Sequence, residues 1–480
     1  MRDRSRRKLA RLLGCSALLA LTLPTSAQAH GIVGKADLPI PVWLFSWTAA
    51  IVLVVSFVAL STLWRTPQLQ SAVPRRLSAR RGLPAKGLEA LAGAVGLALF
   101  ALVLYSGFDG AQVANANFSV TFIYVIFWVG LPVLSVLFGD VFKAFNPWRA
   151  FARLCRAALA PLIGRGGRSA PLRYPSALGQ WPAIAGLIGF AWLELVYVNR
   201  DEPSVLAALS LGYFAAMVVG MLAFGVERWG QSADGFGVYF GLLGRISPLF
   251  RDEQGRLSLR RPLSGLTDLP VGPGTVTLIC TLIGTTTFDG FSNGGIWRKS
   301  EPSLQSVFVD LGLSATPAQE LAYSLGLLLS IGLIVLVYRI GILGVRSVSD
   351  RFDAGQLTRS FAHTLVPIAF AYVLAHYFSL LLWQGQAIWY LASDPLGNGS
   401  NLFGTAGYQI DYHVISYAGI WYVQVAALVA GHVGGLALAH DRALVMYRDP
   451  EEAVRSQYWM LAVMVAFTSF GLWLLSSVGT

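Results

Sequence analysis

The stretch FAHTLVPIAFAYVLAHYFSLLLW (residues 361–383) is strongly apolar and contains no Asp, Glu, Lys or Arg. About 20 such residues are needed for an α-helix to cross the ~30 Å hydrocarbon core of a bilayer. The stretch therefore predicts a membrane-spanning helix. It also contains His363 and His376, two of the six histidines of the chain, and an ionisable group inside hydrocarbon requires an explanation.

The rest of the chain has the same character, with 55% hydrophobic and only 13% charged residues. This composition is typical of a polytopic membrane protein and not of a soluble domain. We predict an all-α transmembrane bundle of about ten spans: 42–64, 88–107, 119–139, 177–198, 204–226, 273–291, 321–345, 361–383, 415–438 and 458–478.

The N-terminus MRDRSRRKLARLLGCSALLALTLPTSAQAH has a basic start, an apolar stretch and the small-residue site Ala27-Gln28-Ala29. This order is typical of a signal peptide. We expect residues 1–29 to be removed and residues 30–480 to form one transmembrane domain in a bacterial-type cytoplasmic membrane.

The basic residues predict the orientation of the bundle, because cytoplasmic loops carry an excess of Lys and Arg. With His30 outside, the loops rich in Lys and Arg all fall inside: 65–86, 140–176, 227–272, 346–360 and 439–457. The opposite loops 108–118 and 384–414 contain no Lys or Arg. We therefore expect both mature termini outside, and the net charge of +11 does not imply nucleic acid.

Polar residues gather at one predicted depth near the outer surface. At ~1.5 Å per helical residue, the outer ends of their spans contain Glu194, Asp289 and His376, while Asp411 and His413 enter the ninth span from the same side. Such residues inside a span are functional candidates by default. Interhelical hydrogen bonding without chemistry is the alternative.

A second polar level lies towards the cytoplasm. His363 and His432 fall at similar depths, and His440 and Asp441 follow at the membrane boundary, where structural residues are common. Close helix packing is expected around His432 because Gly431, Gly434 and Gly435 are its neighbours in the sequence.

Asp, Glu and His around one point suit a divalent ion such as Zn²⁺ or Mn²⁺. Such an ion activates water and polarises phosphoryl or carbonyl oxygens. The same residues suit a transport site in which a carboxylate takes up and releases a proton. The spacing of these residues in the sequence does not decide between a metal site and a transport site, since HExxH, GxSxG and P-loop patterns are absent.

Several segments resemble multi-span proteins of the fenitrothion hydrolase type. They are AHGIVGKADLPIPVWLFSWTAAIVLVVSFVAL (29–60), LFGDVFKAFNPWRAFARL (137–154), FAHTLVPIAFAYVLAHYFSLLLWQGQ (361–386) and WYVQVAALVAGHVGGLALAHDRAL (421–444). The resemblance implies hydrolysis of the aryl P–O bond of a lipophilic organophosphorus triester that partitions into the bilayer.

We accordingly predict a metal-assisted hydrolase in which Asp289 and His376 bind the ion and Glu194 is the third ligand or the general base. Asp411 and His413 would orient the substrate or protonate the leaving group. The rival interpretation is a transporter or permease that uses the outer residues and the His363–His432 level as successive stations. A third is a membrane-embedded scaffold or metal-handling accessory protein that uses His30. A continuous polar path favours transport, whereas an outer pocket sealed below favours an enzyme.

Overall fold

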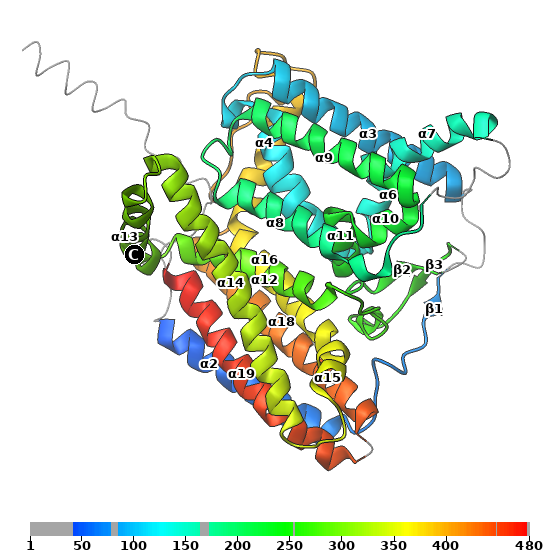
Figure 1. Cartoon of the computed structure of the whole chain (residues 1–480), viewed down its shortest axis with the longest axis vertical. Helices are drawn as coiled ribbons and strands as arrows, with labels where there is room; N and C mark the ends of the chain where they lie inside the picture. Colours follow the sequence, from blue (N-terminus) through cyan, green and yellow to red (C-terminus); the bar gives the residue numbers. More distant parts are fainter. Residues whose placement is uncertain (1–41, 78–84, 164–171, 253–254, 448, 478–480) are drawn as a thin grey trace, which may run out of the picture.

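The computed structural model describes residues 42–77, 85–163, 172–252, 255–447 and 449–477. The expected signal peptide, its cleavage site and His30 lie outside these residues. The described chain is mostly helical with very little strand, and Figure 1 shows its helices packed into one bundle. The predicted all-α class is confirmed.

Eight helical segments are long and apolar enough to cross a membrane in the described part of the chain. Five are single helices with these bounds: α2 Val42–Leu63, α3 Ala85–Asp109, α9 Pro203–Phe224, α14 Ala315–Arg346 and α18 Tyr417–Met446. A sixth is α19 Pro450–Ser477.

The two remaining segments are composite. The first runs through α4 Phe118–Thr121, the π-helix η3 Phe122–Gly130 and α5 Leu131–Phe138. The second runs through α15 Ala354–Phe361, η7 Ala362–Thr364, α16 Leu365–Trp383, η8 Gln384–Ala387 and α17 Ile388–Ser393. The opening stretch of the sequence therefore is a helix, with a short 3₁₀ turn around His363.

Two of the ten predicted spans form shorter helices that are not among the eight. The first, α8 Trp181–Leu195, has 15 residues and a length of ~22 Å at 1.5 Å per residue. The second, α12 Thr275–Ser292, has 18 residues. Most of α12 is buried by neighbouring helices, so it presents little surface to lipid and tolerates many threonines. These two helices contain Glu194 and Asp289.

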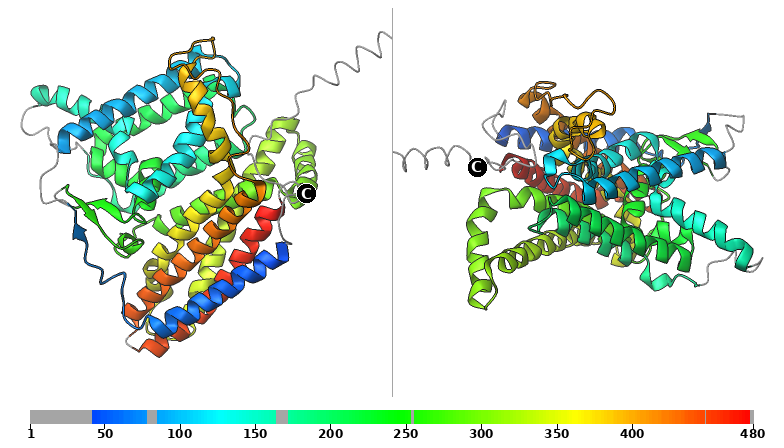
Figure 2. Two further views of the ribbon diagram at one scale, coloured as in Figure 1. Left: turned by 180° about the vertical axis from the view of Figure 1, so that it is seen from behind. Right: turned by 90° about the horizontal axis from the view of Figure 1, so that it is seen from above.

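Shorter helices connect the long ones. They are α6 Phe142–Phe145, α7 Pro147–Ile163, α10 Val226–Ser232, α11 Gly235–Gly244 and α13 Gly295–Asp310, with the 3₁₀ turns η2 Ala114–Ala116, η5 Ser176–Leu178 and η6 Ser264–Leu266. The helix α11 is apolar, short and buried. Figure 2 shows α13 standing away from the main body at the end of α14.

A small antiparallel sheet lies at one end of the bundle. Its strands are β1 Arg75–Arg76, β2 Leu249–Arg251 and β3 Leu257–Leu259, in the order β1-β3-β2. β2 and β3 form a hairpin, with Arg251 opposite Leu257 and Gly255 at positive φ. The pairing of β1 with β3 was not predicted, because two arginines alone contain no strand signal.

Long-range packing brings the first described helix against the last two. The first described helix, α2, packs against α18 and α19, and these three lie side by side in Figure 2. In the centre, α16 contacts α12, α18 and η3. It therefore joins the helices of the first half of the chain to those of the second half.

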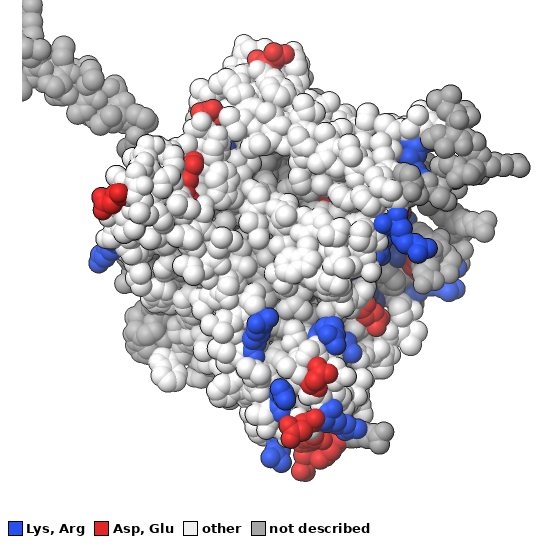
Figure 3. Space-filling model, in the orientation of Figure 1, with Lys and Arg blue, Asp and Glu red and all other residues white. Residues whose placement is uncertain are grey.

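Charged side chains lie mainly at the ends of the bundle. In Figure 3, the central surface is almost free of charge, Lys and Arg gather towards the sheet and α15 together with some acidic groups, and the charged groups at the opposite end are mainly acidic. This distribution fits a bundle whose middle lies in lipid.

Candidate functional site

A buried polar cluster lies where α12 meets α16. Asp289 near the end of α12 faces His376 and Tyr377 of α16, with Asp289 Oδ2 2.8 Å from His376 Nε2. Tyr377 donates its hydroxyl hydrogen to the same oxygen at 2.7 Å. Asp289 is 1% exposed and His376 5%. The structure thus brings together the two residues that were predicted as metal ligands.

Neighbouring residues hold this cluster in place. Asn293 Nδ2 lies 3.3 Å from Asp289 Oδ1 and donates to the Asp289 carbonyl at 2.8 Å, one helical turn away. A Cβ on Gly290 would lie 3.1 Å from Leu474 side-chain atoms and 3.7 Å from His376 Cε1. The glycine therefore lets α19 and the imidazole approach α12 closely.

Glu194 lies at the end of α8, which packs against α12. Its side chain is buried, and its carboxylate lies close enough to Asp289 for the two charges to repel each other. The end of α8 is fixed by Trp192, whose Nε1 donates to Ser324 Oγ at 2.9 Å. Glu194 is thus an electrostatic neighbour of the cluster, whereas Asp289 and His376 contact each other directly.

The geometry does not fit the predicted metal site. Across residues 42–477, outside the undescribed gaps, no group of three His, Cys, Asp or Glu side chains is arranged to hold an ion. Asp289 Oδ2 already accepts the Tyr377 hydroxyl and lies at hydrogen-bonding distance from His376. An ion there would replace both contacts, so we derive no chemical step through a metal.

Asp411 and His413 do not reach the cluster. They lie in the loop between α17 and α18, and their side chains are 57% and 97% exposed. Gln386 in η8 holds this loop by donating to the Asp411 carbonyl and accepting from its N–H, both at 3.0 Å. A substrate-orienting role inside the bundle is therefore not supported for either residue.

His363 and His432, which were predicted to share one polar level, lie in two separate environments. His432 Nδ1 lies 2.8 Å from the Leu428 carbonyl one turn earlier, and its ring lines a small cavity of about 60 Å³. His363, in η7, lies in the field of Arg442, which is ten residues beyond His432 along α18. The two histidines do not form one site.

The glycines beside His432 act as predicted. A Cβ on Gly431 would lie 2.2 Å from the Ala371 Cβ, and one on Gly435 would lie 2.8 Å from the Thr364 carbonyl. Glycine at these positions therefore allows α18 to pack directly on α16 and η7. His432 faces protein rather than lipid, because it is fully buried.

Tyr372 lies between the two polar levels and was not predicted from the sequence. It precedes His376 by one helical turn, and its ring centre is 6.2 Å from that of His432. Its hydroxyl donates to the Phe467 carbonyl at 3.3 Å. Since Tyr372 and His432 both pair with backbone carbonyls, they do not form a hydrogen-bonded path between the levels.

His440 and Asp441 have a structural role. The Asp441 carboxylate accepts four hydrogen bonds at distances of 2.5 to 3.2 Å. One comes from Trp64 Nε1, and three come from the consecutive backbone N–H groups of Gln68, Leu69 and Gln70. His440 Nε2 lies 2.9 Å from the Trp64 carbonyl. The pair fixes the loop after α2 against α18.

A large cavity of about 760 Å³ lies among α3, η3, α5, α8 and α9. Its lining is almost entirely apolar and aromatic, and it includes Trp192 and Leu193, the residues directly before Glu194. Pockets for small ligands commonly have volumes of ~300–1,000 Å³. The cavity is therefore large enough for a lipophilic molecule.

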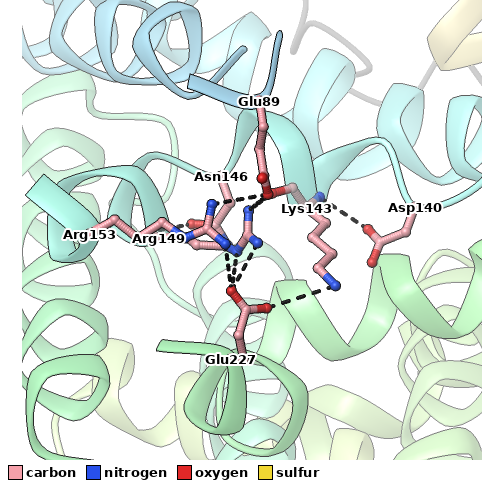
Figure 4. Close-up of polar contacts among 7 residues, drawn as sticks. All are labelled: Glu89, Asp140, Lys143, Asn146, Arg149, Arg153 and Glu227. Atoms are coloured by element: carbon pink, nitrogen blue, oxygen red, sulfur yellow. Dashed lines mark hydrogen bonds and ion pairs between the residues drawn. The ribbon is translucent and has the colours of Figure 1, made fainter. Parts of the chain in front are cut away.

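Another polar network lies at the basic end of the bundle. Arg149 of α7 lies between Glu89 and Glu227, with Nη1 2.7 Å from Glu89 Oε1 and Nη2 2.9 Å from Glu227 Oε1. Arg153 bridges the same two acids, and Lys143 approaches Glu227 (Figure 4). Burial raises the pKa of Glu227, but Arg149, Lys143 and Arg153 outweigh this effect and lower it overall.

Asp234 forms the centre of a neighbouring network. Its carboxylate accepts hydrogen bonds from Asn146, Trp148 and Tyr213 at 2.6 to 3.0 Å. Burial nevertheless raises the pKa of Asp234. The segment FNPW (145–148) supplies two of these donors, so its function here is to join α7 to the start of α11.

No protein-family model, curated protein or solved structure matches this chain.

Proposed function

We propose that this chain is a membrane-embedded hydrolase in which Asp289 and His376 form a general-base pair. The observation that carries the proposal is the 2.8 Å contact between Asp289 Oδ2 and His376 Nε2 inside the bundle. A base oriented by a buried carboxylate is a recurring arrangement in hydrolytic enzymes.

The pair can activate water as follows. With its proton on Nε2, the imidazole donates to Asp289, and Nδ1 is left to accept a proton from water. The resulting hydroxide attacks phosphorus, the aryl P–O bond breaks, and the aryl oxide leaves with the bonding electron pair. Tyr377 stabilises the negative charge of Asp289 through its hydrogen bond.

The substrate class rests on the sequence resemblance and on the apolar cavity. A neutral triester partitions into lipid, and the aromatic lining of the cavity suits such a molecule. The wall between the cavity and the pair contains α8 and η3, which contact α12 and α16 respectively. Glu194 lies in this wall, next to Leu193, and we assign it the transfer of a proton to the leaving oxide.

Purified protein in detergent, assayed with an aryl phosphotriester, tests this proposal. We expect Asp289→Asn and His376→Gln each to lower kcat/KM by 10²-fold or more, in line with the usual contribution of general-base catalysis. Asp310→Asn, on the exposed end of α13, is the matched control and should retain wild-type turnover. Equal turnover in all three variants would remove the proposed site.

A second function, proton-coupled transport, is supported by the charge interaction between buried Glu194 and Asp289. Two carboxylates that repel each other in a low-dielectric interior favour a shared proton, which is a common device in transporters. Proteoliposomes that enclose a pH dye distinguish the two functions. Substrate-dependent proton movement without triester cleavage would favour transport, whereas cleavage without proton movement would favour the hydrolase.

A further inference from the structure

A basic hollow of about 410 Å³ lies on the surface beside the network of Figure 4. It is formed where α7 passes the start of α10, and its charged lining residues are Arg153, Arg156, Arg228 and Glu227. The hollow is distinct from the cluster of Asp289 and His376 and is not used by the proposed hydrolase.

The acid in this hollow is already neutralised by other groups. Glu227 Oε1 accepts from Arg149 Nη2 at 2.9 Å and from Arg153 Nη2 at 2.8 Å, and Lys143 Nζ lies 3.8 Å from its other oxygen. Arg228 is held over the ring of Tyr174, with its Cζ 5.5 Å from the ring centre. The hollow therefore presents a positively charged surface.

The helix α7 has a basic face and an apolar face, which is an observation independent of the hollow. Arg149, Arg153 and Arg156 follow the spacing of one helical face, while Phe151 and Leu154 lie on the opposite face and are 40% and 60% exposed. Figure 1 shows α7 projecting sideways beyond the ends of α3 and α9. An amphipathic helix of this kind lies in a membrane surface with its apolar side chains among the acyl chains.

We propose that this hollow binds the phosphate headgroup of an anionic phospholipid, on the side of the membrane where the basic loops lie. Guanidinium groups bind phosphate through paired hydrogen bonds, and basic pockets between spanning helices commonly hold anionic headgroups. Leu154 and the exposed edge of Phe151, whose ring packs 5.4 Å from that of Phe214 in α9, would contact the acyl chains of the same leaflet. A soluble phosphate shares the headgroup chemistry but lacks these chains.

The test uses the full-length protein in detergent, titrated separately with phosphatidylglycerol, phosphatidylcholine and soluble glycerol phosphate. Native mass spectrometry measures bound lipid, and the thermal unfolding midpoint measures stabilisation. We expect the wild type to bind phosphatidylglycerol preferentially and to unfold at a higher temperature with it. The double variant Arg156→Gln/Arg228→Gln should bind this lipid roughly tenfold more weakly, because two guanidinium groups that line the hollow and bind the phosphate are lost.

Two further variants control for charge and folding. Arg346→Gln/Arg359→Gln removes the same charge from exposed positions on α14 and α15 and should keep wild-type lipid binding. Arg156→Lys/Arg228→Lys should recover most of the loss. Equal affinity for phosphatidylglycerol in the two glutamine variants would overturn the proposal. So would a stabilisation by glycerol phosphate that equals that of the lipid.

Discussion

The two polar networks of this bundle contain acids with very different partners. Asp289 is approached by the imidazole of His376 and the hydroxyl of Tyr377. Glu89 and Glu227 are instead paired with the permanent positive charges of Arg149 and Arg153. A guanidinium is always charged, whereas an imidazole gains and loses a proton near neutral pH.

Under the proposed function, this difference separates a stabilising network from a reactive one. Ion pairs with arginine join α3, α7 and α10 and leave no proton to exchange. The contact between Asp289 and His376 joins α12 and α16 through a group that can accept a proton from water. We therefore expect changes at the arginine network to alter stability first, and changes at the Asp289 cluster to alter activity first.

The largest stability effect is expected at Arg149. Arg149→Met removes the charge that lies between Glu89 and Glu227 and leaves both acids less well paired. Breaking a buried pair costs ~3–5 kcal/mol, but these glutamates are 36% and 48% exposed, so we expect about 2 kcal/mol. Denaturant unfolding in detergent measures the loss. Arg346→Met is the control, and equal stability of the two variants would contradict the structural role of the network.

A smaller stability effect but a clear activity effect is expected at Tyr377. Tyr377→Phe removes one hydrogen bond to Asp289, and such a bond contributes ~1 kcal/mol. Turnover of the triester should fall roughly tenfold, since the charge on Asp289 is less well stabilised. Tyr417→Phe, at an exposed ring, should leave turnover unchanged. A matching fall in both variants would show that the effect is not specific to the cluster.

The smallest effect is a pH dependence at Glu227. Its pKa lies below the ordinary value of 4.5 because the effect of the arginines exceeds that of burial. The charged form therefore stabilises the folded protein above about pH 4.5, and this stabilisation is lost as the pH falls through the lowered pKa. In Glu227→Gln, the thermal unfolding midpoint should change less between pH 5 and pH 3 than it does in the wild type. An unchanged pH profile in this variant would show that Glu227 does not contribute.

Depth along the membrane could be read from the sequence, but rotation about each helix axis could not. The rise of ~1.5 Å per residue placed Asp289 and His376 at one level, and the structure joins them. Whether Glu194 turns towards the same point depends on how α8 packs against α12. Depth alone also grouped Asp411 and His413 with this cluster, although the loop that holds them faces solvent.

The arginine network was missed for a related reason. Glu89, Arg149 and Glu227 belong to three helices that are far apart in the sequence, and each looks like an ordinary boundary residue. The close helix packing around His432 could be predicted from its neighbouring glycines, because small residues on an apolar helix let another helix approach closely. Tyr377 and Tyr372 had no such signal among the many aromatic residues of the spans.

A double-mutant cycle on triester turnover tests the central claim most directly. Asp289→Asn, His376→Gln and the combined variant are compared with the wild type, with circular dichroism to establish that each is folded. If the two residues act as one general-base pair, the combined variant should be no slower than the slower single variant. Losses that multiply in the combined variant, or single variants as active as the wild type, would contradict the account.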